Sequence, residues 1–167
     1  MTTIVITKQE LFDLVNQETV YLSDPVGAEQ DNAIKRLADV LPMTEDDRDF
    51  FNVKLYEAGV RILNQLAFNV EGVDFPYSVT DDTDPFHPNS IVYKFNLYNG
   101  ANELVVLPLV QQYVAESLIK YIVLEWLKVK GYTNYIPQKT LEFENSLSEI
   151  KSSLMYGQRA KKKYVTL

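Results

Sequence analysis

The feature that most constrains this chain is the stretch LVVLPLVQQYVAESLIKYIVLEWLKVKG, residues 104–131, which is apolar on almost every side. A membrane span needs about 20 apolar residues, and each charge at its centre costs roughly 2.5 to 3.5 kcal/mol. Glu116, Lys120 and Glu125 therefore argue against a bilayer. A narrow polar stripe at near-helical spacing instead predicts a soluble central helix packed on protein; it consists of Gln111, Gln112, Glu116 and Lys120.

Proline and glycine mark the ends of this helix. It begins near residue 102 or 106, depending on whether Pro108 lies in the first turn or kinks the helix. Lys128, Lys130 and Gly131 are typical of a helix end. The helix is apolar over more of its circumference than one partner helix covers. Two explanations stay open: it is buried at the centre of its own fold, or a leftover face contacts another subunit.

The N-terminal region shows two short helical patterns. Residues 7–16 begin with Thr7 and carry Glu10 three positions later, which is a capping-box pattern. A turn cluster of Ser, Asp, Pro and Gly over residues 23–27 ends this unit. Residues 29–41 form a second amphipathic segment that is closed by Pro42.

Two longer helices follow from apolar residues at helical spacing. Thr44 precedes three acidic residues, which are favoured in a first turn by the helix dipole. The apolar positions of this helix continue to about residue 67 and are Phe51, Leu55, Ala58, Ile62 and Leu66. A last helix starts at Pro137 and runs to about residue 156, with one narrow apolar seam formed by Phe143, Leu147, Ile150 and Leu154.

A β pattern interrupts the helices. The run IVYKFNLY, residues 91–98, alternates its side chains and predicts a strand. A weaker strand over residues 75–79 would complete a hairpin whose loop is the acidic segment DDTDPFHPNS, residues 81–90. The expected fold class is therefore mainly α: a bundle of four or five helices around a long central helix, with an inserted β-hairpin near residues 72–98.

Length and composition fit one ordinary globular domain. The chain has 167 residues, of which 46% are hydrophobic and 23% charged. We assign residues 1–158 to a single helical domain and residues 159–167 to a basic C-terminal tail. The absence of cysteine excludes disulfides and thiolate metal sites. The N-terminal residues lack a basic segment followed by a long apolar one, so we expect no export.

Charge is shared unevenly along the chain. Residues 1–100 hold 7 Lys and Arg against 17 Asp and Glu, whereas residues 101–167 hold 9 against 6. An acidic body with a basic end repels a nucleic acid duplex over most of its surface and attracts anions at one place. A surface whose charges serve only solvation explains the same pattern.

Residues that carry chemistry are sparse. The single histidine, His87, lies near Asp81, Asp82 and Asp84, but the set lacks the glycine and the spaced glutamate of a calcium loop and the nitrogen or sulfur donors of a zinc site. We therefore predict a solvated loop and no metal or cofactor. Neither a GxSxG nor an SxxK motif occurs, and the glycines are scattered singly, so we expect no enzyme.

The basic tail is the more informative segment. Its cationic residues and the tyrosine that follows are suited to binding phosphates or to docking on an acidic protein surface; they are Arg159, Lys161, Lys162, Lys163 and Tyr164. Four cations are too few for stable DNA binding by an acidic body. A tail that simply frays into solvent is the alternative.

This arrangement resembles the small head-to-tail connector proteins of tailed bacteriophages, also called adaptor, neck or ring proteins, including those of crAss-like Bacteroides phages. The resemblance rests on short N-terminal helices, the acidic helix start TEDDRDFF, an inserted hairpin, a long apolar helix with LEWLKVKG, an amphipathic helix and the RAKKK tail. It covers most of the chain but includes no diagnostic motif.

The resemblance implies a structural virion protein of the phage neck, assembled in the cytoplasm of the bacterial host. Copies would form a ring, usually of about twelve, between the portal protein and the tail. The genome would pass through this ring without specific binding, and no membrane is involved. Loops and termini of the family reach neighbouring proteins, which implies a contact role for the tail and for the acidic loop residues Asp81, Asp82, Asp84 and Phe86.

A second hypothesis belongs to a different class of protein. The chain would be a monomeric regulatory module that binds nucleic acid or an anionic ligand through Lys161, Lys162 and Lys163. Steep salt dependence of DNA binding by an isolated monomer would distinguish this module from a ring subunit.

Overall fold

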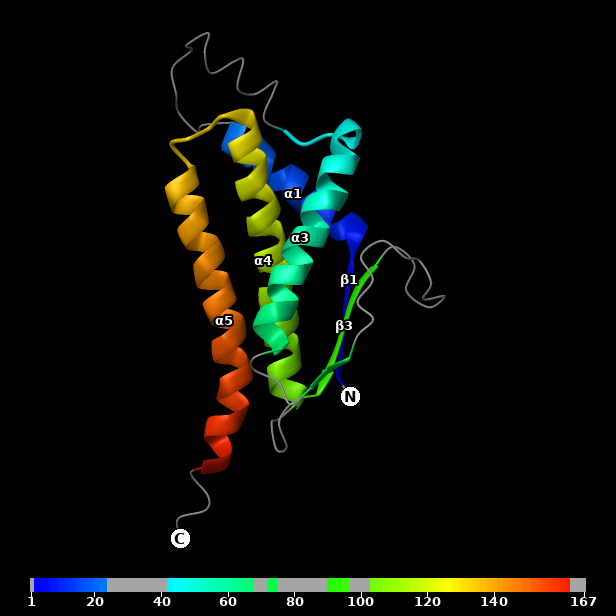
Figure 1. Ribbon diagram of the computed structural model, residues 1–167, viewed down its shortest axis with the longest axis vertical. Helices are drawn as coiled ribbons and strands as arrows, with labels where there is room; N and C mark the ends of the chain where they lie inside the picture. Colours follow the sequence, from blue (N-terminus) through cyan, green and yellow to red (C-terminus); the bar gives the residue numbers. More distant parts are fainter. Residues whose placement is uncertain (1, 24–41, 68–71, 75–89, 97–102, 163–167) are drawn as a thin grey trace.

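The computed structural model describes residues 2–23, 42–67, 72–74, 90–96 and 103–162 (Figure 1). These residues form a helical bundle with a small sheet on one side, as the sequence predicted. The elements, in chain order, are β1 (Thr2–Thr7), α1 (Lys8–Ser23), a 3-10 turn (Glu45–Asp47), α3 (Arg48–Ala67), β2 (Gly72–Asp74), β3 (Ser90–Asn96), α4 (Glu103–Lys130) and α5 (Ile136–Lys162).

The long helix α4 is the central element. It packs against α1, α3, α5 and β1, and Figure 1 shows it between α5 and α3. Its side chains are buried over most of its circumference because partners surround it; the buried apolar ones are Val106, Val110, Val114, Leu118, Tyr121, Ile122, Val123, Leu124, Trp126 and Leu127. Of the two explanations for this helix, burial within its own fold is therefore correct for the greater part of its surface.

The two ends of α4 differ in how well the sequence located them. The helix starts at Glu103, so Pro108 lies within the helix rather than in its first turn. Proline lacks an N–H group, which removes one helical hydrogen bond at that point. The C-terminal end matches the prediction: α4 ends at Lys130, and Gly131 follows with a φ of 80°. Glycine adopts this left-handed conformation without the steric cost that a Cβ atom would bring.

Helix α3 packs one apolar stripe into the core. Five residues of the stripe are fully buried, as predicted: Phe51, Leu55, Ala58, Ile62 and Leu66. At its start, the backbone N–H and the hydroxyl of Thr44 both donate to Oδ2 of Asp47, at 2.9 and 3.0 Å. This contact fixes the entry of the chain into the 3-10 turn that leads into α3, because Asp47 accepts a backbone N–H that lacks a helical partner.

Helix α5 runs antiparallel to α4 and packs along the predicted seam, in which Phe143, Ile150 and Leu154 are buried and Leu147 is half-buried. The two helices also share a buried polar contact, since the Ser117 hydroxyl donates to the Ser146 hydroxyl at 2.8 Å. Helix α5 is longer than expected and continues to Lys162.

The sheet has one strand more than the predicted hairpin. Three strands lie in the order β1-β3-β2, and both pairings are antiparallel. Strand β1 was not predicted; its Thr2 pairs with Phe95 and its Thr7 with Ser90. The partner of β3 in the hairpin is Gly72–Asp74, which lies before the expected residues 75–79. Residues 75–79 are outside the described residues.

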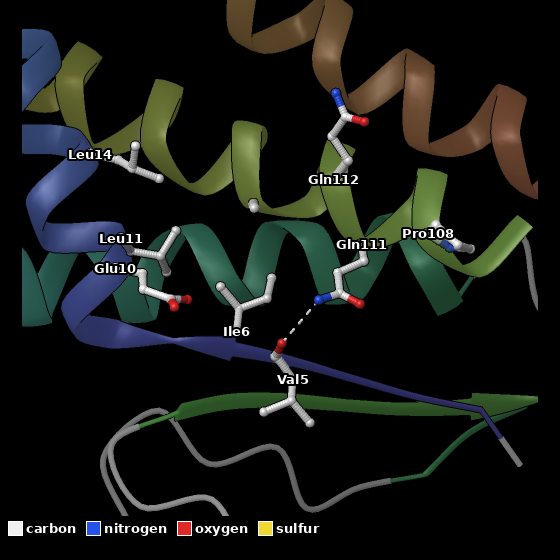
Figure 2. A pocket seen from close by; sticks show the side chains of 9 residues that line it. Val5, Ile6, Glu10, Leu11, Leu14, Pro108, Gln111 and Gln112 are labelled. Carbon is white, nitrogen blue, oxygen red and sulfur yellow. Dashed lines mark hydrogen bonds between the residues drawn. The ribbon is translucent and has the colours of Figure 1, made fainter.

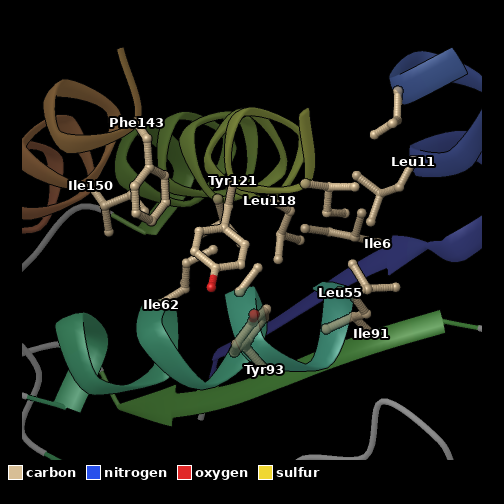
Figure 3. Packing of buried hydrophobic residues seen from close by; sticks show 14 of the residues in the cluster. Ile6, Leu11, Leu55, Ile62, Ile91, Tyr93, Leu118, Tyr121, Phe143 and Ile150 are labelled. Carbon is tan, nitrogen blue, oxygen red and sulfur yellow. The ribbon is translucent and has the colours of Figure 1, made fainter. Parts of the chain in front are cut away.

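The core lies where the sheet and the helices converge (Figure 3). Ile91 and Tyr93 of β3 point into it, as the alternation in the sequence predicted, and both are buried. An edge-to-face pair joins Phe12 of α1 to Phe51 of α3, with ring centroids 5.1 Å apart. Tyr121 of α4 packs against Phe143 of α5 at 5.2 Å. These two aromatic contacts therefore join α1 to α3 and α4 to α5.

Two further predictions concern the N-terminal region. Helix α1 starts directly after Thr7, as predicted, but it extends to Ser23 rather than ending near residue 16. The predicted helix over residues 29–41 lies outside the described residues. Within the described part of the chain, no helix has an apolar run of the length and purity that crossing a bilayer requires.

Candidate interaction surface

The sequence pointed to the basic tail and to the acidic loop as contact sites. Helix α5 includes Arg159, Lys161 and Lys162, so the backbone in the first part of the predicted tail is helical. Cations near a helix C-terminus are also stabilised by the helix dipole, which is an explanation without any partner. The remaining predicted contact residues lie outside the described residues: Lys163, Tyr164, Asp81, Asp82, Asp84 and Phe86, together with His87.

A surface that the sequence did not predict lies between β1, α1 and α4 (Figure 2). It is an open groove with a volume of about 430 Å³, and we call it the α1–α4 groove. Most of its lining is apolar; the lining residues are Val5, Ile6, Glu10, Leu11, Leu14, Pro108, Gln111, Gln112 and Ala115. A groove of this kind is suited to receive apolar side chains of another segment.

One wall of the α1–α4 groove is the outer edge of the sheet. The Gln111 side chain reaches from α4 and donates from Nε2 to the backbone oxygen of Val5 at 3.3 Å (Figure 2). The Val5 carbonyl therefore points away from β3. Backbone groups alternate in direction along an antiparallel strand, so Thr3 also presents its N–H and C=O groups on this side. An edge of this kind is a template for a further extended chain.

The opposite wall is the beginning of α1, whose outer face keeps apolar side chains in contact with solvent. Leu14 is 46% exposed and Tyr21, seven residues later on the same face, is 69% exposed. Val20 beside them is also exposed. The outer face of α1 thus extends the apolar surface of the groove along the helix.

The ionisable residues on the α1 side of the groove are acidic, whereas Glu116 on the α4 side pairs with Lys120 at 3.5 Å. Glu10 is the only ionisable residue among those that line it. One turn further along α1, Asp13 is exposed and accepts a hydrogen bond from Gln9 at 2.8 Å. The second amide, Gln112, donates to Glu116 at 2.9 Å. A partner of the groove would therefore combine apolar side chains with positive charge.

Exposed apolar side chains also occur on other parts of the described chain, among them Leu109 of α4 at 38% exposure. Val53, on the outer side of α3, is 56% exposed, and Tyr56 lies one turn beyond it. Near the turn between α4 and α5, Val129 is 65% and Leu141 is 58% exposed. The apolar surface of the molecule is thus divided among separate helices rather than gathered on α4.

A smaller cavity of about 180 Å³ lies between α1, α4 and α5, and ionic contacts close it. The buried Lys139 donates from Nζ to Glu18 at 2.8 Å and to Glu142 at 2.9 Å, which links α5 to α1. Burial lowers the pKa of Lys139, but its hydrogen bonds to the two carboxylates outweigh burial and raise the pKa above 10.5. Each charged side chain that lines the cavity has a partner of opposite charge, and the ion pair of Lys139 with Glu18 holds α5 to α1.

Metal binding would require several ligand side chains of the described residues to lie together. Among them, no group of three or more His, Asp or Glu side chains is placed to hold a metal ion. Every buried side-chain nitrogen or oxygen in the same part of the chain has a hydrogen-bond partner. A buried polar group without a partner is one sign of a binding site, and here the described residues offer none.

A sequence signal for the groove existed in β1. All six residues of TTIVIT, Thr2 to Thr7, are β-branched, which favours a strand. The position of β1 at the edge of the sheet depends on its pairing with β3, which is distant in the sequence. The groove therefore became visible only from the fold.

Comparisons with protein-family models, with curated proteins and with solved structures find no match to this chain.

Proposed function

We propose that this chain is a structural protein that assembles with copies of itself into a ring, and that this ring belongs to the head-to-tail connector of a tailed bacteriophage. The observation that carries the proposal is the exposure of apolar side chains on separate helices, Leu14 and Tyr21 on α1 and Val53 on α3. A ring requires head-to-tail contacts between two unlike patches of each subunit. Separate apolar faces on one subunit meet that requirement.

Charge supports the same proposal. The chain carries a net charge of −7, and its basic residues are concentrated toward residues 159–163. A basic end that meets an acidic face of the next copy orients subunits head to tail. An acidic wall also repels the DNA that a connector must let pass. We propose a ring of about twelve copies in the virion neck, in contact with the portal protein or with a neighbouring neck protein.

The burial of α4 limits which surfaces of the subunit can form the ring contacts. Most of the apolar residues that the structure describes on this helix are covered within the monomer, although Leu109 and Val129 are exposed, so α4 supplies little surface for other subunits. Ring contacts are therefore assigned to α1 and α3, with α4 as the support that positions them. This assignment predicts which surface variants weaken assembly.

Native mass spectrometry and electron microscopy of the purified chain, alone and mixed with a portal protein, test the proposal. We expect closed oligomers and a stoichiometric complex with the portal. Val53→Lys on α3 should weaken ring formation, because it places a charge in the proposed contact. Thr133→Lys, an exposed position in the turn after α4, is the matched control.

A chain that stays monomeric at high concentration and ignores the portal would refute the ring. If such a monomer bound DNA with steep salt dependence, the alternative function, a regulatory module that uses Lys161 to Lys163, would replace it.

A further inference from the structure

The α1–α4 groove combines three properties that together define a partner. Its lining is apolar apart from Glu10 and two glutamines, the charges on its α1 side, Glu10 and Asp13, are negative, and one wall is the outer edge of β1. An extended segment with apolar side chains and positive charge would satisfy all three. A helix would meet the apolar wall but would not use the backbone groups of the sheet edge.

The chain itself contains a segment of this chemistry. Residues 161–167, KKKYVTL, place three lysines directly before Tyr164, Val165, Thr166 and Leu167. Tyrosine, valine and threonine are common in strands. Five residues, 163–167, follow the described part of α5 and would span roughly 17 Å when extended. The six residues of β1 span a similar length, about 20 Å.

Geometry favours the segment of a second copy over that of the same copy. Helices α4 and α5 are antiparallel and are aligned by the contact of Ser117 with Ser146, so a rise of about 1.5 Å per residue from that contact places Lys162 beyond the level of Glu103. Figure 1 shows the C-terminal end of α5 extending past the start of α4. A segment that returned from Lys162 to the level of Pro108–Ala115 would travel roughly 10 to 20 Å along α4. It would also have to cross from α5 to β1. Helix α4 lies between α5 and β1 (Figure 1), and packed helices are about 8 to 10 Å apart, so the crossing adds a further distance of that order and the whole path is longer than the roughly 17 Å that five residues span.

We propose that residues 163–167 of one subunit lie in the α1–α4 groove of the next subunit. The backbone of the segment runs along the outer edge of β1, where Gln111 already donates to the Val5 carbonyl, and its apolar side chains contact Leu14 and Pro108. The lysines lie beside Glu10 and Asp13. This contact rests on the proposed ring, and it adds to the contacts of α1 and α3 a second link between consecutive copies.

A photo-crosslinking experiment on the full chain tests the contact directly. A benzophenone amino acid replaces Tyr164, unlabelled and 15N-labelled copies are mixed, and cross-linked peptides are identified by mass spectrometry. We expect cross-links between light and heavy copies that map to groove residues such as Leu14 and Pro108. Cross-links within a single copy would overturn the proposal.

Two other outcomes separate this inference from the proposed function. Cross-links between copies at a surface other than the groove would overturn the groove contact and leave the ring in place. The absence of any oligomer would overturn both.

Surface variants provide the second test. Leu14→Lys should weaken self-association about tenfold, because it removes an apolar contact and adds a charge to the groove. Leu141→Lys is the matched control, since Leu141 is also an exposed leucine in a helix but lies outside the groove, and it should leave self-association unchanged. Equal effects of the two variants would refute a specific role of the groove.

A charge exchange tests the polarity of the contact and does not depend on one variant folding well. Glu10→Lys alone and Lys163→Glu alone should each weaken self-association, and the double variant should recover most of the loss. Circular dichroism confirms that each variant is folded before association is measured. A double variant that associates no better than the single variants would count against the proposed polarity.

Discussion

Replacing Ser117 and Ser146 by alanine, singly and together, measures how a buried polar contact holds α4 against α5. Both serines are fully buried. The Ser117 hydroxyl donates to Oγ of Ser146 at 2.8 Å, and the Ser146 hydroxyl donates to the backbone oxygen of Phe143 at 2.7 Å. The pair is therefore a directed chain in which the two serines have different roles.

Because the hydrogen bonds run from Ser117 to Ser146 and from Ser146 to Phe143, the two single variants should lose unequal amounts of stability. Ser117→Ala removes one donor and leaves the Ser146 hydroxyl with its acceptor on Phe143, at a cost of about 1 kcal/mol. Ser146→Ala leaves the donor of Ser117 buried without its acceptor, which costs about 1 to 3 kcal/mol. The better helix propensity of alanine offsets about 0.5 kcal/mol in each case.

The double variant should be close to wild type or slightly more stable. It leaves no hydroxyl to satisfy, and two alanines fit where two serines fitted. The two single effects then fail to add by about 2 kcal/mol, which is the coupling free energy of the pair. Urea denaturation followed by circular dichroism at 222 nm, at a concentration where subunits do not assemble, gives the four unfolding free energies. Additive effects would show that the two hydroxyls do not interact and that the argument is wrong.

Three further predictions concern stability and use the same urea assay. Lys139→Met should destabilise the fold by about 1 to 2 kcal/mol, because its partly exposed partners lose their cation. Burial raises the pKa of Glu142, but hydrogen bonds, first the one from Lys139, outweigh burial and hold the pKa below 4.5. The resulting stabilisation is complete above pH 4.5 and disappears as the pH falls through the folded-state pKa. Wild type should therefore lose more stability than Lys139→Met between pH 7 and pH 3, and equal losses would show that Lys139 does not lower the pKa of Glu142. Asp47→Ala should cost about 1 kcal/mol through the lost contact with Thr44, and an unchanged midpoint would show that this cap is not needed. Leu55→Ala should cost about 2 to 5 kcal/mol because Leu55 is fully buried, and a smaller loss would mean that neighbouring side chains fill the cavity.

Helical periodicity predicted the bundle well because it is a local property. The stripe of α3 and the seam of α5 repeat at the spacing of a helix surface, and the buried residues match both. The polar stripe of α4 is also present: Gln112 donates to Glu116, and Lys120 lies 3.5 Å from the same carboxylate. These contacts connect side chains four residues apart, so the sequence alone specified them.

The sheet and the groove depended on contacts that the sequence does not display. Strand β1 consists of β-branched residues, but only its pairing with β3 places it at the edge of a three-stranded sheet. The contact between Gln111 and Val5 joins two elements far apart in the chain. The helix pattern that starts at Thr7 gives no indication of a strand directly before it. Non-local pairing of this kind is what single-sequence reasoning misses most readily.

The position of α4 changes where assembly contacts are to be sought. A helix this apolar suggests a surface for binding other subunits, but α1, α3, α5 and β1 cover most of it. The apolar surface that remains exposed is smaller and divided, and one part of it is a groove bounded by a sheet edge, with Glu10 at its rim and Leu14 beside it. A groove of this kind distinguishes partners by the direction of their backbone and by the sign of their charge, which a flat apolar face does not. Copies joined through such a contact would assemble in one orientation only, and that orientation is what a closed ring requires.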